Sequence, residues 1–363
     1  SKKWRKGSDY LLIPQILFYA MFLNFFMKIY GLLLAFIVRI SKKYVLLQSK
    51  KFVSTMINRE LIRIRIVQIV YAWYQNSNNS LKNAEKELLF GFQKSYDLYY
   101  YLLLLMVKLT DMYENRIETR KNKFLPSEED LNPNTHLINN KFIQQLRINK
   151  QFCHYLNERP LSWEANENFV KNLLDKILES ETYKTYTEIE NPTYADDREF
   201  WRKIFKQFIY NNEELDEILE DESIYWNDDI EIVQTFTLKT IRKFSEEKGA
   251  DQPLLPMFKD EEDKQYALKL LSETILNEKK YRSLIEKHID KWDLDRIAFM
   301  DMIIMQVAVA EIFSFESIPT RVTLNEYIEI AKAYSTPKSG SFVNGILDAI
   351  VTEIKKDNLI FKH

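Results

Sequence analysis

Three arginines lie within seven residues at the start of an apolar, periodic segment. Arg59 and Arg63 are four residues apart, so they share one side of a helix, and Arg65 lies on another side. A guanidinium group presents a planar fork of donors that matches the oxygens of a phosphate. Single-stranded RNA binding needs such cations together with polar or aromatic groups that contact bases. An ordinary solvated helix face carries the same charges, and the residues alone favour that simpler interpretation.

Residues suited to catalysis or metal binding are scarce. The chain has one cysteine, Cys153, and four histidines. Cys153 and His154 are adjacent, so on a helix they do not face each other. The sequence contains no P-loop, dinucleotide-binding glycine motif or zinc-protease motif. We therefore expect no enzyme activity, no metal and no cofactor.

Long helices must position these groups. Only six of the 363 residues are glycine and nine are proline, too few for the many turns of a sandwich or barrel, and 46% are hydrophobic. In residues 57–75 the apolar side chains recur at spacings of four and three, which predicts an amphipathic helix with one buried stripe. That stripe consists of Ile62, Ile66, Ile69 and Trp73. The sequence predicts an all-α protein.

The same patterns predict the helices that follow. We expect them over about 81–125, 137–157, 164–181, 196–212, 261–289 as one or two helices, 299–313, 324–334 and 341–355. The apolar run 98–109 is short and rich in tyrosine, so it predicts a core helix rather than a membrane span. Polar or proline-containing stretches at 76–80, 126–133 and 248–260 predict linkers or loops.

The first fifty-five residues differ from the rest. They carry ten Lys/Arg and one acid, and Tyr10 to Met27 is an uncharged run. By length this run is a candidate membrane anchor. Its Phe, Tyr, Leu, Ile and Lys content is also typical of translated AT-rich non-coding DNA, and we favour this spurious extension over the anchor.

From Met56 onward the chain is acidic, with 41 Lys/Arg and 52 Asp/Glu. Residues 77–262 hold 24 basic and 36 acidic residues, and the acidic tract 213–231 is interpreted as a solvated face. A region of this sign does not attract nucleic acid by its overall field. Any RNA contact must come from a local patch.

The last hundred residues resemble the NusB family of bacterial transcription antitermination factors. The matching positions run from a tryptophan through a Pro-led turn and an Asn-Glu helix to the motif Phe-Val-Asn-Gly-x-Leu-Asp. They are Trp292, Arg296, Asp301, Glu311, Pro319, Asn325, Glu326, Ala331, Lys332 and Phe342 through Asp348. The first helix fits the family's arginine-rich opening and its Gln-x-x-Tyr-x-Trp step. Those positions are Arg59, Arg63, Gln68, Tyr71 and Trp73.

The chain departs from this family in length. Roughly 180 residues separate the two matching stretches, whereas a family member is less than half as long in total. Glu273 stands where the family has a glycine, and Glu60 lies inside the arginine cluster. The resemblance implies NusB-like helical bundles with an enlarged helical N-terminal half. We divide the chain into 1–55 (spurious or anchor extension), 56–76 (arginine-bearing first helix), 77–260 (acidic helical insertion) and 261–363 (NusB-like C-terminal domain).

The resemblance also implies where RNA binds. In the family, the first helix and the turn before the last helix contact a short RNA element called boxA. Carried over, the candidate RNA-binding residues are Arg59, Arg63, Arg65, Gln68, Tyr266, Lys332, Lys338, Ser339 and Phe342. Amide groups at a helix start suit a phosphate near Lys338 and Ser339. Phe342 fits base stacking and core packing equally well.

Four further residues of the matching motif receive structural interpretations. Asn325 is expected to cap or brace its helix start, and Glu326 to pair with Arg296. Asn344 and Gly345 are expected to form a packing pair, because a glycine inside a helix usually marks a close approach of another backbone.

The function implied by the resemblance is that of a cytoplasmic bacterial antitermination factor. It would bind boxA-like RNA of ribosomal transcripts, pair with the ribosomal protein NusE, and act on the RNA polymerase elongation complex with other Nus factors. One alternative is a protein-interaction scaffold of that complex without direct RNA binding, which the acidic charge and Glu60 favour. A membrane-tethered form is a third alternative, which depends on residues 1–55 and which we do not favour.

Overall fold

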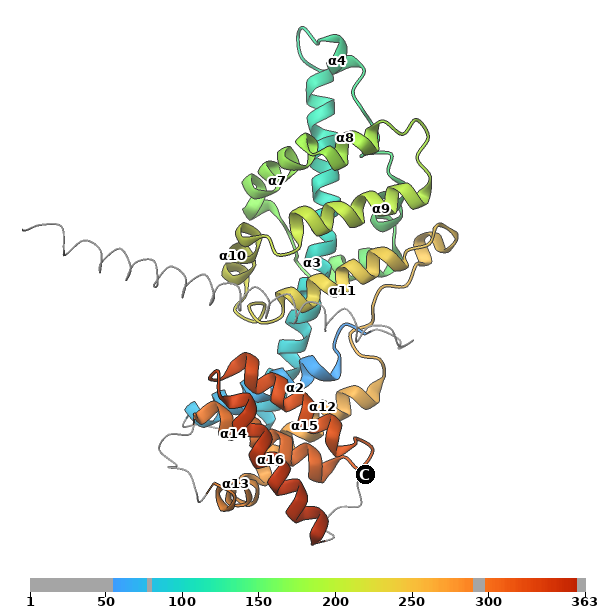
Figure 1. Ribbon diagram of the computed structural model, residues 1–363. Helices are drawn as coiled ribbons and strands as arrows, with labels where there is room; N and C mark the ends of the chain where they lie inside the picture. Colours follow the sequence, from blue (N-terminus) through green and yellow to red (C-terminus); the bar gives the residue numbers. More distant parts are fainter. Residues whose placement is uncertain (1–54, 77–79, 290–297, 358–363) are drawn as a thin grey trace, which may run out of the picture. The chain divides into compact units, whose positions relative to one another are not determined.

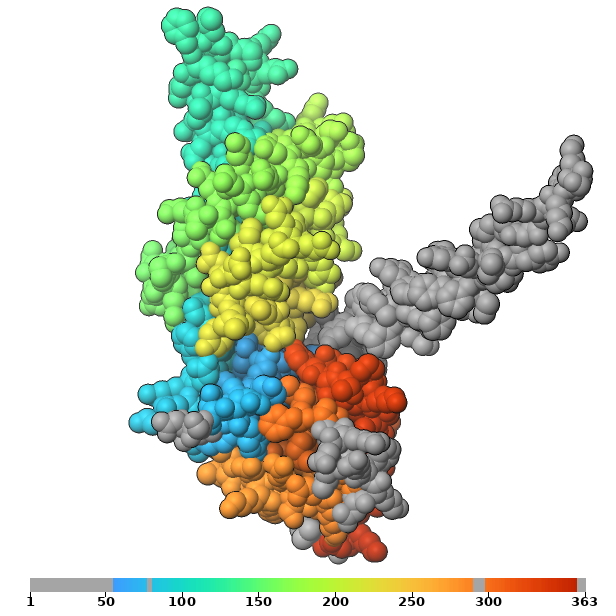
Figure 2. Space-filling view, turned by 90° about the vertical axis from the view of Figure 1, so that its left-hand side faces the viewer, coloured from blue at the N-terminus to red at the C-terminus, as the bar shows by residue number. Residues whose placement is uncertain are grey.

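The computed structural model describes residues 55–76, 80–289 and 298–357 (Figure 1). Within these residues all regular structure is helical, which confirms the all-α prediction. The described residues belong to one compact unit (Figure 2). The expected extension or anchor at 1–55 lies almost wholly outside the described residues. Among the described helices, none is long and apolar enough to cross a membrane.

The first half of the described chain contains α2 and a set of helices arranged along α3. The bounds are α2 Arg59–Gln75, α3 Leu81–Lys121, α4 Glu128–Leu131, α5 Lys141–Arg147, α6 Lys150–Glu158, α7 Glu167–Glu179, α8 Glu181–Thr187, α9 Tyr194–Ile204, α10 Glu213–Glu222 and α11 Ile230–Lys243. The 41-residue α3 packs against α4, α5, α6, α7 and α11, and also against α2 and α12. Residues 81–251 are the helical part of the predicted insertion 77–260, and we call them the insertion from here on. Its α8, α10 and α11 were not predicted as helices, and α4 lies within the predicted loop 126–133. The predicted helix 137–157 is two helices, α5 and α6.

The C-terminal helices pack around α14. Their bounds are α12 Glu261–Leu276, α13 Glu278–Lys287, α14 Phe299–Ser314, α15 Thr320–Tyr334 and α16 Ser339–Lys356. Twelve consecutive residues of α14, from Asp301 to Ile312, are buried, because helices α2, α12, α13, α15 and α16 surround it. The predicted start of α15 at Leu324 is wrong: Pro319 occupies the position before the first turn, so the helix begins at Thr320.

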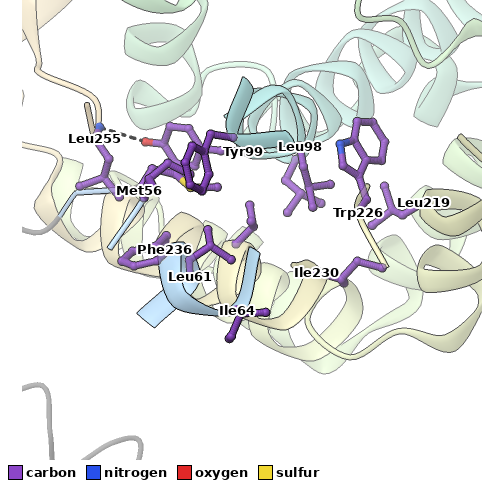
Figure 3. Packing of buried hydrophobic residues seen from close by; sticks show 14 of the residues in the cluster. Met56, Leu61, Ile64, Leu98, Tyr99, Leu219, Trp226, Ile230, Phe236 and Leu255 are labelled. Carbon is purple, nitrogen blue, oxygen red and sulfur yellow. Dashed lines mark hydrogen bonds between the residues drawn. The ribbon is translucent and has the colours of Figure 1, made fainter. Parts of the chain in front are cut away.

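The hydrophobic core is continuous between the insertion and α2. Figure 3 shows Leu61 and Ile64 of α2 beside Leu98 and Tyr99 of α3 and Ile230 and Phe236 of α11. The backbone N–H of Leu255, in the segment after the insertion, donates to the Tyr99 hydroxyl at 3.3 Å. The insertion therefore shares its interior with the arginine-bearing helix.

Candidate nucleic-acid interface

Helix α2 is positioned by its start and by its apolar surface. The Asn58 side chain accepts a hydrogen bond from the Leu61 N–H at 2.8 Å and so caps the helix. Leu61, Ile62, Ile66 and Val70 are fully or nearly fully buried, and α2 packs against α3, α12 and α14. With neighbours on several sides, α2 points some of its charged side chains into the protein.

Arg63 is one of these buried residues. Its Nε and Nη2 donate to the two carboxylate oxygens of Glu311 at 2.8 and 3.1 Å, and its Nη1 donates to Glu326 at 3.2 Å. Only 4% of the Arg63 side chain and none of the Glu311 side chain is exposed. The prediction that Glu326 pairs with Arg296 falls on a residue outside the described ranges; within them, the partner of Glu326 is Arg63.

Three hydroxyl groups complete the surroundings of Glu311. The Thr323 hydroxyl donates at 2.7 Å, the Tyr327 hydroxyl at 3.2 Å, and the Tyr266 hydroxyl also donates to this carboxylate. Burial alone would raise the pKa of Glu311, but the charge of Arg63 and these hydrogen bonds hold it below its usual value. We call Arg63, Glu311, Tyr266, Thr323 and Tyr327 the Glu311 cluster. It joins α2, α12, α14 and α15 through fully paired polar groups.

Arg65 is buried on another side of α2. Its Nη2 donates to the Asp229 carboxylate, to the Tyr225 carbonyl at 3.2 Å and to the Ser95 hydroxyl at 3.3 Å. The side chain passes close to Gly91 of α3, where an added Cβ would lie 3.2 Å from Arg65 Cδ. Burial raises the pKa of Asp229 to about 6, against the opposing charge of Arg65 and the hydrogen bond from Ser95. Arg65 therefore ties α2 to the insertion.

Arg59 is the most accessible of the three arginines, with 35% of its side chain exposed. It donates to Asp263 at 3.2 Å and to Glu262 at 3.4 Å, and its guanidinium carbon lies 4.8 Å from the centre of the Tyr266 ring. Tyr266 itself is buried. Among the arginines expected to bind phosphate, Arg63 and Arg65 thus face inward, which corrects the solvated-face interpretation for these two residues.

The end of α2 carries an exposed aromatic pair. Tyr71 is 39% exposed and Phe299, the first residue of α14, is 40% exposed, with ring centres 5.7 Å apart. Nearby on α2, the Gln68 side-chain amide donates to Asp228 at 2.6 Å, while its oxygen has no hydrogen-bond partner within the described residues. Phe299 was not anticipated as a site residue. An aromatic at the start of an apolar helix resembles any core residue in sequence.

The turn before α16 contains the other predicted residues. Ser339 is buried, and its hydroxyl donates to Asp301 of α14 at 2.8 Å, so it braces the turn and offers little surface. Lys338 is exposed and precedes the first turn of α16. Phe342 is half-buried against the core, and Lys332 is exposed with its amine 2.9 Å from Glu329.

Two glycines of α16 differ from the prediction that Gly345 marks a close approach of another part of the chain. An added Cβ at Gly340 would lie 2.6 Å from Cγ of Lys332, so the close approach occurs there. Asn344 and Gly345 are exposed, and a Cβ at Gly345 would meet nothing within 4 Å. The predicted packing pair at 344–345 is therefore wrong, and Asn325 is likewise exposed in the interior of α15 rather than at its start.

The arginines and the last turn contact different parts of α14. Arg63 meets Glu311, whereas Ser339 meets Asp301, ten residues earlier and thus about 15 Å away along the helix. Tyr71 lies against Phe299, at the same end of α14 as Ser339. The groups gathered near the start of α14 are therefore aromatic and polar, and the arginine side of α2 lies toward its other end.

The described residues offer no metal site: no group of three or more His, Cys, Asp or Glu side chains is arranged to hold an ion.

The sequence identified Glu311 only as one position of the family motif and gave it no role in the site. A single carboxylate within the apolar run MIIMQVAVAEIF indicates a buried acid that needs a paired cation, but the sequence does not identify Arg63 as that cation.

Comparison with known proteins gives matches in the C-terminal part of the chain. A model described as NusB family matches residues 229–352, so the match begins at the end of the insertion and includes α11. The transcription antitermination protein NusB of Salinibacter ruber is 41% identical over 100 residues, 28% of this chain and 62% of that protein. The protein of the same name from Chloroherpeton thalassium is 42% identical over 99 residues, 27% of this chain and 47% of that protein.

A third relative is covered more fully. The transcription antitermination protein NusB of Listeria welshimeri is 38% identical over 109 residues, 30% of this chain and 84% of that protein. A solved structure of T. maritima NusB is 32% identical, with a TM-score of 0.25, and the alignment covers 32% of this chain and 82% of that one.

Proposed function

Because the chain belongs to the NusB family, we propose that it acts in the cytoplasm of a bacterial cell as a transcription antitermination factor. Its action is binding rather than catalysis. The observation that carries this proposal is the similarity of the C-terminal helices to three proteins named for that role. In this proposal the chain binds boxA-like RNA and pairs with ribosomal protein NusE within an RNA polymerase elongation complex that contains other Nus factors.

The RNA surface in this proposal is the edge formed around the start of α14. Tyr71 and Phe299 offer exposed rings on which unpaired bases can stack, and stacking contributes about 1–3 kcal/mol per base. Lys338 brings an exposed cation, whereas the amide oxygen of Gln68 is buried, so Gln68 contributes only the rest of its partly exposed side chain. Phe342 and Lys332 flank this edge. Arg59 is a separate phosphate contact, while Arg63, Arg65, Tyr266 and Ser339 act by holding the fold.

Titration of fluorescent boxA RNA with the full chain tests this proposal. Replacement of both Tyr71 and Phe299 by alanine should weaken binding about tenfold or more, because the stacking surface is lost. Phe124→Ala is the matched control, since this aromatic residue is 97% exposed on the insertion, far from α14 in sequence. Equal affinity for boxA and a scrambled RNA of the same length, or an unchanged affinity of the double variant, would contradict the proposal.

A scaffold function without direct RNA binding is the second candidate. It is favoured by the carboxylate partners of all three α2 arginines, which leave little charge for phosphates. Here the exposed stretch of α16 around Gly345 would take the protein partner, because a bare helical backbone lets another chain come close. Gly345→Arg should then abolish capture of NusE. Recovery of NusE without any RNA would favour the scaffold over the RNA-binding factor.

A further inference from the structure

Between α9 and α11 the protein surface contains an arginine-lined cavity that is open to solvent. It has a volume of about 570 Å³ and is lined by Arg198, Glu199, Arg202 and Arg242. These residues come from α9 and α11, which pack against each other (Figure 1). Every lining side chain is charged, and three of the four are guanidinium groups. The cavity is thus cationic within a region whose overall charge is negative.

The structure holds two of these arginines in place. Arg198 donates to the Phe244 carbonyl at 2.7 Å, and Arg202 forms a two-pronged pair with Glu199, both distances being 2.6 Å. Glu199 neutralises one of the three cations, which leaves a local excess of two positive charges. Arg242 is exposed, and no hydrogen bond or ion pair holds its guanidinium group within the described part of the chain. A ligand in the cavity therefore meets the Arg198 guanidinium, which is held by a hydrogen bond, and the Arg242 guanidinium, which is not. Both lie beside the neutralised Arg202–Glu199 pair.

The positive charge continues along α11. Lys239 lies three residues before Arg242, and Lys243 lies four residues after Lys239, so all three share one side of the helix. Burial and the charge of Lys243 lower the pKa of Lys239, while Glu60 in the first turn of α2 opposes this shift. The first turn of α2 therefore brings the carboxylate of Glu60 near Lys239, and the positive charge beside the cavity is that of α11 itself.

We infer that this cavity binds a backbone phosphate of single-stranded RNA that extends beyond the boxA element. The inference rests on the proposed RNA-binding function. Planar guanidinium forks match phosphate oxygens, and Lys239 and Lys243 continue the positive charge along α11. Since the insertion as a whole is acidic, attraction here must come from direct contact and not from a long-range field.

The full chain and three RNAs test the inference. The first RNA is boxA alone, and the other two carry a single-stranded extension of about ten nucleotides at one end or at the other. The wild-type protein should bind one extended RNA more tightly than boxA alone. Arg242→Glu should remove that gain, about tenfold, and leave binding of boxA alone unchanged. The salt dependence for the extended RNA should become shallower by about 0.7 in log–log slope per lost phosphate contact.

Lys171→Glu is the matched control, because Lys171 is an exposed residue of α7 in the same insertion and the change in charge is equal. It should keep the gain. No gain from either extension, or equal losses in the two variants, would overturn the inference while boxA binding still supports the proposed function. If the wild type binds none of these RNAs, the proposed function itself fails. A final experiment adds inorganic phosphate at constant ionic strength and measures the melting temperature of the protein. If phosphate raises the melting temperature but neither extended RNA binds more tightly than boxA alone, the cavity binds free phosphate and the RNA assignment is overturned.

Discussion

The arginines of α2 and those of the insertion have the same chemistry but opposite surroundings. Arg63 and Arg65 are enclosed by helices and neutralised by Glu311 and Asp229. Arg242 is open to solvent beside a cavity. The difference arises from the neighbours: α2 packs against three helices, whereas the charged end of α11 has one exposed side. A cluster of arginines in sequence therefore indicates ion pairing or ligand binding, and packing decides between them.

The largest expected effect tests whether Arg63 is a structural residue. Arg63→Ala leaves the buried Glu311 without its cation, so we expect a loss of about 3–5 kcal/mol in the free energy of unfolding. Urea denaturation measures this loss. Arg116→Ala is the control, because its pair with Asp175 is partly exposed and should contribute less than about 1 kcal/mol. A loss as small as that of the control would mean that Arg63 is not held by the Glu311 cluster.

A second prediction concerns the pH dependence of the Arg65–Asp229 contact. The pKa of Asp229 is raised to about 6, above the value near 3.9 of an unfolded chain. The folded protein therefore takes up this proton first, and the stability linked to Asp229 increases as the pH falls from about 6 to 4 and is lost as the pH rises through 6. The change is on the order of 2 kcal/mol.

Denaturation midpoints of the wild type and Asp229→Asn at pH 7 and pH 5 measure this effect. The variant should gain less stability than the wild type between these two values. Identical pH dependence of the two proteins would show that Asp229 titrates as an ordinary surface carboxylate. Glu311, whose pKa is lowered, acts in the opposite direction, since its contribution is lost only as the pH falls through its depressed pKa.

The smallest expected effect distinguishes the exposed arginines from the buried ones. Arg59→Gln removes a half-exposed pair and should change the unfolding free energy by less than about 1 kcal/mol. Arg242→Ala should change it by no more than about 0.5 kcal/mol. Thermal denaturation of both variants checks these values. A loss of several kcal/mol in unfolding free energy for either variant would show that the residue is structural, as Arg63 is, and would contradict the distinction between exposed and buried arginines.

Periodicity in the sequence was enough to locate most helices. The stripe Ile62, Ile66 and Ile69 marks α2 correctly, and the run before Ser314 marks α14. The start of α15 was mispredicted because a proline such as Pro319 is found both at the end of one segment and directly before the first turn of a helix. Helix α11 was not predicted because its start lies within the strongly acidic tract 213–231, which was interpreted as a solvated face.

The candidate site was harder to predict because it depends on which side of each helix is covered. Arg63 and Arg65 look alike in sequence, yet each finds a different carboxylate far along the chain. The two glycines of α16 show the same difficulty. Only the path of the Lys332 side chain makes Gly340 the crowded position and Gly345 the open one. RNA contact by the predicted residues stays a prediction.

The length of α3 has a consequence for how the protein unfolds. A single helix of 41 residues, about 60 Å long, contributes side chains both to the insertion and to the packing of α2 and α12. With no break in that helix and one shared interior, the two regions cannot melt independently. Heating should give one cooperative transition, and a helix-breaking residue in the middle of α3 should disturb the C-terminal helices as well as the insertion.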